Sequence, residues 1–351
     1  MTIYFKNAYI NNSSVVAGPF LIDGPLKGKF DEEYNDFYDG EKTFEDCEIK
    51  ELKKSISYII RKEKDKNIDL LLSSDLNNQI FISNMVAEKV GIPYLGLYNA
   101  CASYCEELII GSSLLYNKDI KRIICTTSGH NMTSERTYRN PVEYGAPKPK
   151  YSTFTVSAAT STLISNEKSE VRIECGTIGK VTDLGVMDSN DMGSAMVPAA
   201  ARTLFEHLND TGRNEKYYDL ILTGDLGEYG KQIFKEYCFT EYGYSLDNYN
   251  DSATLIYNKD DKRVLAGGSG PSCLPSYFLI DILPKMRNKK IKKVLLLATG
   301  ALLSVTSSNQ KKSIPCICHA VSLEVVWYIY IHLFFLVLFV YLEKFLWQSI
   351  N

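Results

Sequence analysis

The chain repeats part of its own sequence, and this repetition restricts the fold more than any other feature. Residues 69–76 have the sequence DLLLSSDL, and residues 219–226 have DLILTGDL. Later in each half, residues 120–124 (IKRII) are matched by residues 291–295 (IKKVL), and both segments run into a turn of small residues that ends in glycine. Because the two matches occur in the same order, they predict duplicated halves stacked around a shared core.

Helical and strand-like patterns alternate along the chain to about residue 324. Residues 42–65 carry apolar side chains at helical spacing among charged ones, and they predict a helix. Residues 68–72 form a short aliphatic run, which is typical of a buried strand. The alternation favours a layered α/β fold with halves at residues 1–169 and 170–324.

The overall charge and the start of the chain exclude two classes of protein. With 39 basic and 42 acidic residues, the formal net charge is −3, which argues against a general nucleic-acid binder. The first ten residues lack the apolar run of a secretory signal, so we expect the body of the protein in the cytosol.

The nine cysteines predict neither a disulfide framework nor a metal site. An odd number cannot all pair, and disulfides are rare in a chain of this size in the cytosol. There is no C-x-x-C motif, and none of the four histidines is spaced from a cysteine as in a zinc finger. We therefore expect no metal and no cofactor, and we interpret Cys316, Cys318 and His319 as residues of a strand and turn.

Cys101 is the residue that most suggests chemistry. It follows a strand-like run at residues 94–97 and precedes a helix-like stretch at residues 106–115. A cysteine on such a turn lies near backbone N–H groups and the positive end of a helix dipole, which lower a thiol pKa and favour anions. The alternative is a small buried cysteine that packs the start of the helix.

A second candidate segment, residues 127–149, is dense in polar, aromatic and turn residues. It contains His130, Asn131 and Arg136 close together. Long non-repetitive loops in compact domains are often functional, so these three residues are candidates for ligand binding. A solvated surface loop is the alternative.

Four polar residues of the second half are further candidates for ligand binding. Asp191 and Ser194 lie just before a helix predicted at about residues 196–208, where helix capping is the alternative role. Asp225 ends the second copy of the repeated segment. Ser269 lies in a glycine-rich turn that is neither a Walker A motif nor a G-x-G-x-x-G fingerprint, so the turn gives little support to nucleotide binding.

Several motifs in order carry a resemblance to a known family. They are AGP, DGPLKGKFD, LYNACAS, SGHN, ERTYRNPVEYG, TDLGVMDSNDMGSAMVPAAA, LILTGDLGEYG, LAGGSGPSC, ATGALLS and SIPCICHAVSLE. A cysteine-bearing turn in a duplicated α/β chain resembles the thiolase-like superfamily, and the motifs together resemble the stage V sporulation protein AD family over about residues 3–324.

The resemblance implies a fold and a function. The fold would be the thiolase-like α/β/α/β/α duplication with five layers, in a homodimer. The function would be binding of dipicolinic acid (pyridine-2,6-dicarboxylate), free or as its calcium chelate. It would act with the other proteins of the stage V sporulation A membrane complex, which moves this compound into developing spores and out at germination. The location would be peripheral, at the cytoplasmic face of the spore inner membrane.

The same resemblance argues against catalysis. Cys101 falls at the nucleophile position of the condensing enzymes, which pair the thiol with His/His or His/Asn. After the strand at residues 220–223, where the resemblance implies a catalytic histidine, this chain has Gly224 and Asp225. No asparagine stands within residues 267–269 either. We therefore expect a non-catalytic binder; the alternatives are a condensing enzyme or acyltransferase that uses Cys101, and a structural adaptor with a vestigial pocket.

The resemblance ends before a hydrophobic tail at residues 325–351. Residues 325–342 are apolar except for one histidine, and about 20 residues are needed to span a bilayer. Three interpretations compete for the tail: a C-terminal membrane anchor, a buried or amphipathic segment, and an extension derived from a shift of reading frame.

Overall fold

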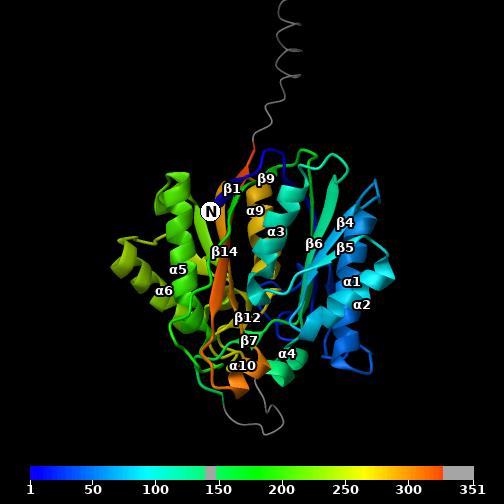
Figure 1. Ribbon diagram of the computed structural model, residues 1–351. Coiled ribbons are helices and arrows are strands. Elements are labelled where there is room, and N and C mark those ends of the chain that lie inside the picture. The colour runs from blue at the N-terminus through cyan, green and yellow to red at the C-terminus, as the bar shows by residue number, and fades with distance from the viewer. Residues whose placement is uncertain (139–147, 327–351) are drawn as a thin grey trace, which may run out of the picture.

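The computed structural model describes residues 1–138 and 148–326 and shows a mixed α/β molecule (Figure 1). In the described part, twelve strands form one large sheet and two strands form a small one. The strands are β1 (Thr2–Tyr4), β2 (Tyr9–Ala17), β3 (Glu32–Glu33), β4 (Leu70–Ser74), β5 (Tyr94–Gly96), β6 (Arg122–Gly129), β7 (Phe154–Thr155), β8 (Ala158–Ser165), β9 (Val171–Thr177), β10 (Leu220–Thr223), β11 (Tyr249–Asp251), β12 (Gly268–Ser269), β13 (Lys293–Ala301) and β14 (Cys316–Val325).

The helices alternate with these strands along the chain. They are α1 (Phe44–Lys62), α2 (Phe81–Val90), α3 (Ser103–Leu114), α4 (Asn131–Tyr138), α5 (Met192–Thr211), α6 (Gly227–Tyr242), α7 (Ala253–Ile256), α8 (Cys273–Tyr277), α9 (Leu283–Arg287) and α10 (Val305–Asn309). The short helical turn η2 (Ala100–Ala102) precedes α3, and the π-helical segment η5 (Phe278–Ile282) joins α8 to α9.

The order of the strands repeats between the two halves. From one edge to the middle the sheet runs β5-β4-β6-β8-β2, and from the other edge it runs β11-β10-β13-β14-β9. In both halves the two pairs nearest the edge are parallel and the next two are antiparallel. The duplication predicted from the sequence is therefore present in the topology, while the boundary at residue 169 stays a prediction.

The repeated sequence segments occupy equivalent strands and make the same hydrogen bonds. Asp69, before β4, accepts bonds from the amides of Lys121 and Arg122 at 2.8 and 2.9 Å. Asp219, before β10, accepts bonds from the amides of Lys292 and Lys293 at 2.7 and 2.9 Å. Each aspartate thus ties its strand to the start of the next parallel strand, which explains why both the carboxylate and the following Ile-Lys pattern recur.

The helices form layers on both sides of the strands (Figure 1). Helices α1 and α2 pack with buried strand residues in one hydrophobic cluster, and α5 and α6 pack in the same way on the second half. Between the halves, α3 and the segment from α8 to α9 share the largest cluster with strands of both halves. Tyr104 and Phe278 lie in this middle layer with their ring centroids 6.5 Å apart. This is the five-layer arrangement expected from the sequence.

Most of the predicted helices and strands are present, but they begin and end at slightly different residues. The helix predicted at residues 42–65 is α1, which begins after the N-cap Thr43. The loop predicted at residues 127–149 differs, because it contains the end of β6 and the helix α4, and residues 139–147 lie outside the described part. Cys316, Cys318 and His319 belong to β14, as expected.

The predicted hydrophobic tail lies almost wholly outside the described residues, so its three interpretations stay open. Within residues 1–138 and 148–326, no helix is both long enough and apolar enough to cross a membrane.

Candidate functional site

Cys101 lies on a tight turn between β5 and α3, as the sequence predicts. Ala100, just before it, has a left-handed backbone with φ of 50°, a conformation that costs energy in a residue with a side chain. The turn packs directly on the end of β13: a Cβ atom on Gly300 would come within 2.8 Å of the Asn99 carbonyl oxygen. The left-handed backbone of the turn and the close packing on Gly300 hold Cys101 in the lining of a cavity.

This cavity of about 240 Å³ lies where the two halves meet. Its lining combines apolar and aromatic side chains with a few polar groups. The lining residues are Leu76, Tyr98, Ala100, Cys101, Ser134, Tyr138, Thr153, Thr155, Met192, Met196, Asp225, Ser269, Gly270, Ala301, Leu302, Leu303 and Ser304. We call this cavity the elbow pocket. Among its described lining residues there is no lysine, arginine or histidine.

The Cys101 thiol keeps its proton in this setting. Burial raises the pKa of Cys101 well above its ordinary value, and the neighbouring Asp225 carboxylate adds to the increase. The helix-terminus effect predicted from the sequence would have acted in the opposite direction, and here it is outweighed by desolvation and by the nearby negative charge. A protonated thiol is a weak nucleophile.

Asp225 is the acidic group of the elbow pocket. It follows β10, is almost completely buried, and accepts a 2.6 Å hydrogen bond from the Thr299 hydroxyl through Oδ1. Its Oδ2 atom is buried and has no conventional hydrogen-bond partner among the described residues. Burial raises the pKa of Asp225 to about 7. A carboxylate with a vacant acceptor in a cavity can bind a cation or a hydrogen-bond donor.

The structure brings together three of the eight predicted ligand-binding residues. Cys101, Asp225 and Ser269 all line the elbow pocket, although they lie far apart in the sequence. Asp191 and Ser194 do not line it: Asp191 is the N-cap of α5 and accepts a bond from the Ser194 amide at 3.4 Å. Capping, the alternative role considered for these two residues, is what the structure shows.

His130, Asn131 and Arg136 also lie outside the lining of the elbow pocket. His130 is fully buried and its Nε2 atom hydrogen-bonds the Phe37 carbonyl oxygen at 2.9 Å. Asn131 donates its backbone N–H to the Ser157 hydroxyl at 2.9 Å. Arg136 forms an ion pair with Glu45. His130 precedes α4, and the residues of α4 that line the pocket are Ser134 and Tyr138 rather than Asn131 and Arg136.

His319 comes close to the elbow without lining the pocket. Its Nε2 atom lies 2.9 Å from the Asn99 amide group, and its Nδ1 atom accepts a bond from the Gly179 amide at 3.2 Å. Burial lowers the pKa of His319 to about 4, so the ring is neutral at neutral pH. With both ring nitrogens engaged, His319 supports the conformation of the turn.

Several apolar residues of the pocket lining could not be predicted from the sequence. Met192 and Met196 reach the pocket from one face of α5, and their spacing of four residues is the only trace that the sequence carries. Tyr98 and Tyr138 meet at the pocket, where their hydroxyl oxygens lie 3.0 Å apart. Their contact joins the segment that follows β5 to α4, and no local sequence pattern predicts it.

Comparison with known proteins supports both the family and the fold. Residues 1–324 match the family described as "Stage V sporulation protein AD (SpoVAD)". The chain is 40% identical over 319 residues to the stage V sporulation protein AD of Bacillus subtilis (strain 168), covering 90% of this chain and 94% of that protein.

Two solved structures share the fold at low sequence identity. OleA from Xanthomonas campestris with bound cerulenin is 12% identical, with a TM-score of 0.59 and coverage of 92% of this chain and 100% of that one. The 3-oxoacyl-(acyl carrier protein) synthase III FabH from Xanthomonas oryzae pv. oryzae is 14% identical, with a TM-score of 0.57 and coverage of 92% and 100%. These likenesses establish a thiolase-like fold.

Proposed function

The chain belongs to the stage V sporulation protein AD family, and on this premise we propose that the elbow pocket binds dipicolinic acid as its calcium chelate without catalysis. The observation that carries the proposal is the chemistry of the lining: one buried carboxylate, a protonated thiol and aromatic rings, with no basic side chain among the described lining residues.

The charge of the pocket decides between the free ligand and the chelate. Dipicolinic acid carries two carboxylates at neutral pH, and the described lining offers a carboxylate from Asp225 and no compensating cation. A buried charge without a partner costs several kcal/mol, at about the size measured for broken buried ion pairs. Calcium removes the conflict, because it prefers six to eight oxygen ligands and the ligand's carboxylates and Asp225 are all oxygen donors.

The size and shape of the pocket favour a compact planar molecule. Its volume of about 240 Å³ lies below the common range of about 300–1,000 Å³ for pockets that hold drug-sized ligands. Tyr98 and Tyr138 supply aromatic surface against which a pyridine ring can pack. The start of α3 adds backbone N–H groups and the positive end of a helix dipole beside Cys101.

Catalysis by Cys101 has less support. A condensing reaction needs a thiolate and a group that activates it, whereas Cys101 keeps its proton and the described lining contains no base other than the Asp225 carboxylate. The thiolase-like relatives in this comparison are enzymes by name, but their identities of 12% and 14% carry the fold alone. We propose that the cysteine packs the turn and borders the ligand.

The remaining expectations from the family resemblance are part of the same proposal. The protein would act as a homodimer, without nucleic acid or a further cofactor, beside the membrane proteins that move dipicolinic acid into developing spores. It would lie peripherally at the cytoplasmic face of the spore inner membrane. The sporulation name of its relatives fits this assignment.

Calorimetric titration of the full chain with dipicolinic acid, with and without calcium, tests the proposal. We expect saturable binding that calcium strengthens and that survives Cys101→Ala. Folded protein that binds under neither condition would contradict the proposal. Incubation with acyl-CoA supplies the opposite test: a stable acyl group on wild-type protein, absent from Cys101→Ala, would support the enzyme instead. Binding of the membrane partners without any ligand binding would support the adaptor.

A further inference from the structure

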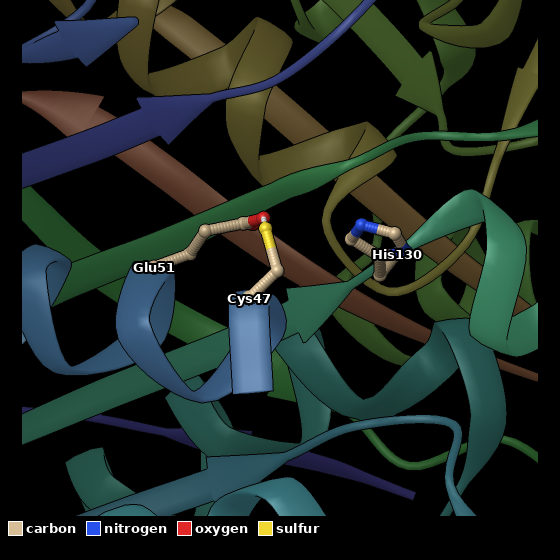
Figure 2. A group of neighbouring side chains, drawn as sticks. All are labelled: Cys47, Glu51 and His130. Carbon is tan, nitrogen blue, oxygen red and sulfur yellow. Dashed lines mark hydrogen bonds between the residues drawn. The ribbon is translucent and has the colours of Figure 1, made fainter. Parts of the chain in front are cut away.

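A second group of functional side chains lies under α1, apart from the lining of the elbow pocket. Cys47 and Glu51 stand one turn apart on α1, and His130 follows the end of β6 (Figure 2). One ligand atom from each residue lies within 4.8 Å of the other two, and all three residues are completely or almost completely buried. Figure 2 shows the side chains of Cys47 and Glu51 meeting and the His130 ring facing them.

Two buried atoms of this group lack a hydrogen-bond partner among the described residues. They are Nδ1 of His130 and Oε2 of Glu51. The opposite ring nitrogen of His130 is held by the Phe37 carbonyl, which fixes Nε2 as the protonated nitrogen and leaves a lone pair on Nδ1. On Glu51, both the Tyr34 hydroxyl and the Cys47 thiol point to Oε1, the thiol at 3.3 Å. Buried polar atoms without partners are rare and call for an explanation.

The rest of the arrangement matches what metal-binding histidines need. A histidine that binds a metal through one nitrogen commonly donates the N–H of the other to a carbonyl or carboxylate, which orients the ring. The rings of Phe37 and Phe44 each lie 5.6 Å from the His130 ring and shield it from solvent. The Tyr34 hydroxyl donates a hydrogen bond to Glu51 and so orients its carboxyl group. The Tyr34 ring packs so closely against Gly18 that a side chain on residue 18 would collide with the Tyr34 hydroxyl.

Charge gives a further argument for a cation. Two carboxyl groups of α1, Glu48 and Glu51, are fully buried, and neither forms an ion pair with a lysine or arginine of the described part of the chain. Burial raises the pKa of both groups, so without a cation they hold protons, and a bound ion would replace the proton of Glu51. Once Cys47 loses its proton, its thiolate and the Glu51 carboxylate carry two negative charges, and a divalent ion makes the group neutral. Neutrality inside a protein avoids the large cost of an isolated buried charge.

We propose that Cys47, Glu51 and His130 bind a divalent transition metal ion, with zinc as the best match. A thiolate, a carboxylate and an imidazole are all ligands that zinc accepts in a tetrahedral site, and three protein ligands leave a fourth position for water. Calcium and magnesium prefer oxygen ligands alone, so the thiol and the imidazole discriminate against them. Binding releases the proton of the Cys47 thiol.

The position of the site indicates a structural role. It would join α1 to the junction between β6 and α4, because His130 lies 83 residues after Cys47 and 79 residues after Glu51 in the sequence. Helix α4 also carries Ser134 and Tyr138 of the elbow pocket. Because the ligands are buried, the ion would enter as the chain folds, and its loss would loosen the wall of the pocket.

Metal analysis of the full chain, purified from cells grown with zinc, tests the proposal. We expect about one equivalent of tightly held zinc per chain, as for a single structural site. Protein refolded with cobalt should show the visible bands of tetrahedral cobalt and a thiolate-to-cobalt charge-transfer band. Cys47→Ser should remove the charge-transfer band, and His130→Ala should weaken metal binding at least about tenfold, in keeping with the loss of a direct ligand.

The chain offers matched controls for both substitutions. His207 is also fully buried, but both of its ring nitrogens are hydrogen-bonded, to Thr177 and Tyr218 at 2.6 Å each. Cys238 is a fully buried cysteine on α6. His207→Ala and Cys238→Ser should retain the metal.

Two results would overturn the assignment. One is folded wild-type protein that holds no zinc or cobalt after growth or refolding with either ion. The other is metal that stays bound, without change in the cobalt spectrum, in both His130→Ala and Cys47→Ser. If these two variants do not fold, Glu51→Gln preserves the shape of the side chain and should show weaker binding by the same measurements.

Discussion

Asp75 and Asp225 occupy the same position in the two halves, and they differ in what their carboxylates contact. Each lies six residues after the aspartate that begins its repeat and just after an equivalent strand, β4 or β10. Both oxygens of Asp75 accept backbone amides, from Asn77 and Ser83, at 2.8 Å each. Asp225 uses one oxygen for Thr299 and leaves the other without a conventional partner beside the elbow pocket.

The difference shows how the same position in two duplicated halves can serve stability in one half and ligand binding in the other. In the first half both oxygens of the aspartate accept backbone amides, and the residue closes a turn. In the second half the equivalent residue accepts a short hydrogen bond from the Thr299 hydroxyl, has the Cys101 thiol and the Gly270 backbone beside it, and has its pKa raised to about 7 by burial. A buried carboxylate oxygen without a hydrogen-bond partner destabilises the fold. Such groups are rare in proteins and are more often found at functional sites.

Removal of the Asp75 carboxylate should have the largest effect on stability. Asp75→Ala leaves the buried Ser83 amide without an acceptor, at about 1–3 kcal/mol, and removes the acceptor of the partly buried Asn77 amide, while relief of the repulsion with Glu48 offsets part of this loss. Asp225→Asn keeps an oxygen for the Thr299 hydroxyl and should change the free energy of unfolding much less. Urea unfolding of both variants compares them, and equal losses would contradict the difference in roles.

Substitution of Gly129, the last residue of β6, and of Gly300, the second-last residue of the equivalent strand β13, should also affect stability differently. A Cβ on Gly300 would lie 2.8 Å from the Asn99 carbonyl and 3.0 Å from the Ala102 amide, both backbone atoms of the elbow. Overpacking of this kind costs about 1–3 kcal/mol, so Gly300→Ala should destabilise the fold and disturb the pocket. At Gly129 only one backbone atom comes as close as 3.0 Å. Gly129→Ala should therefore cost less in the same unfolding measurement.

The raised pKa of Asp225 predicts how binding depends on pH. Calcium binds the ionised carboxylate, so below a pKa of about 7 affinity for the chelate should rise with pH, by up to about tenfold per unit, and then level off. Stability should move in the opposite direction. A carboxyl whose pKa is raised in the folded state stabilises it at low pH, and that contribution is lost as pH rises through the folded pKa. In Asp225→Asn both dependences should flatten, as calorimetry and unfolding at several pH values can determine.

Of these substitutions, Arg136→Ala should change stability and ligand affinity least. The arginine side chain is half exposed, pairs with Glu45 and does not line the elbow pocket. Surface ion pairs of this kind contribute about 0–1 kcal/mol. Arg136→Ala should leave the affinity for dipicolinic acid unchanged within error. A clear loss of affinity in the calorimeter would show that the ligand reaches α4 beyond the described lining.

Much of the secondary structure could be predicted from the sequence. The repeated segments correspond to β4 and β10, and the turn between a strand and a helix at Cys101 lies where it was predicted. These features are local, because a short aliphatic run or a capping residue carries its own signal. The capping role of Asp191 could be weighed in advance for the same reason.

The site itself was less predictable, because it depends on contacts between distant segments. His130 and Arg136 stood beside polar neighbours in the sequence, yet His130, at the end of β6, faces Cys47 and Glu51 of α1, and Arg136, on α4, pairs with Glu45. The pKa of Cys101 was expected to be lowered by the helix, and it is raised by burial and by the Asp225 carboxylate, which comes from the other half. The cluster of Cys47, Glu51 and His130 gave no signal, since its two segments share no motif.

The most direct test of the account is the gain in affinity for dipicolinic acid that calcium produces in wild-type protein and in Asp225→Asn, measured by calorimetry on the full chain. The account predicts that calcium strengthens binding to the wild type by at least about tenfold, the effect of one added charge-assisted contact, and gives little or no gain in the variant. An equal gain in both proteins, with Asp225→Asn folded, would show that the buried carboxylate of the second half does not hold the chelate and would contradict the central claim.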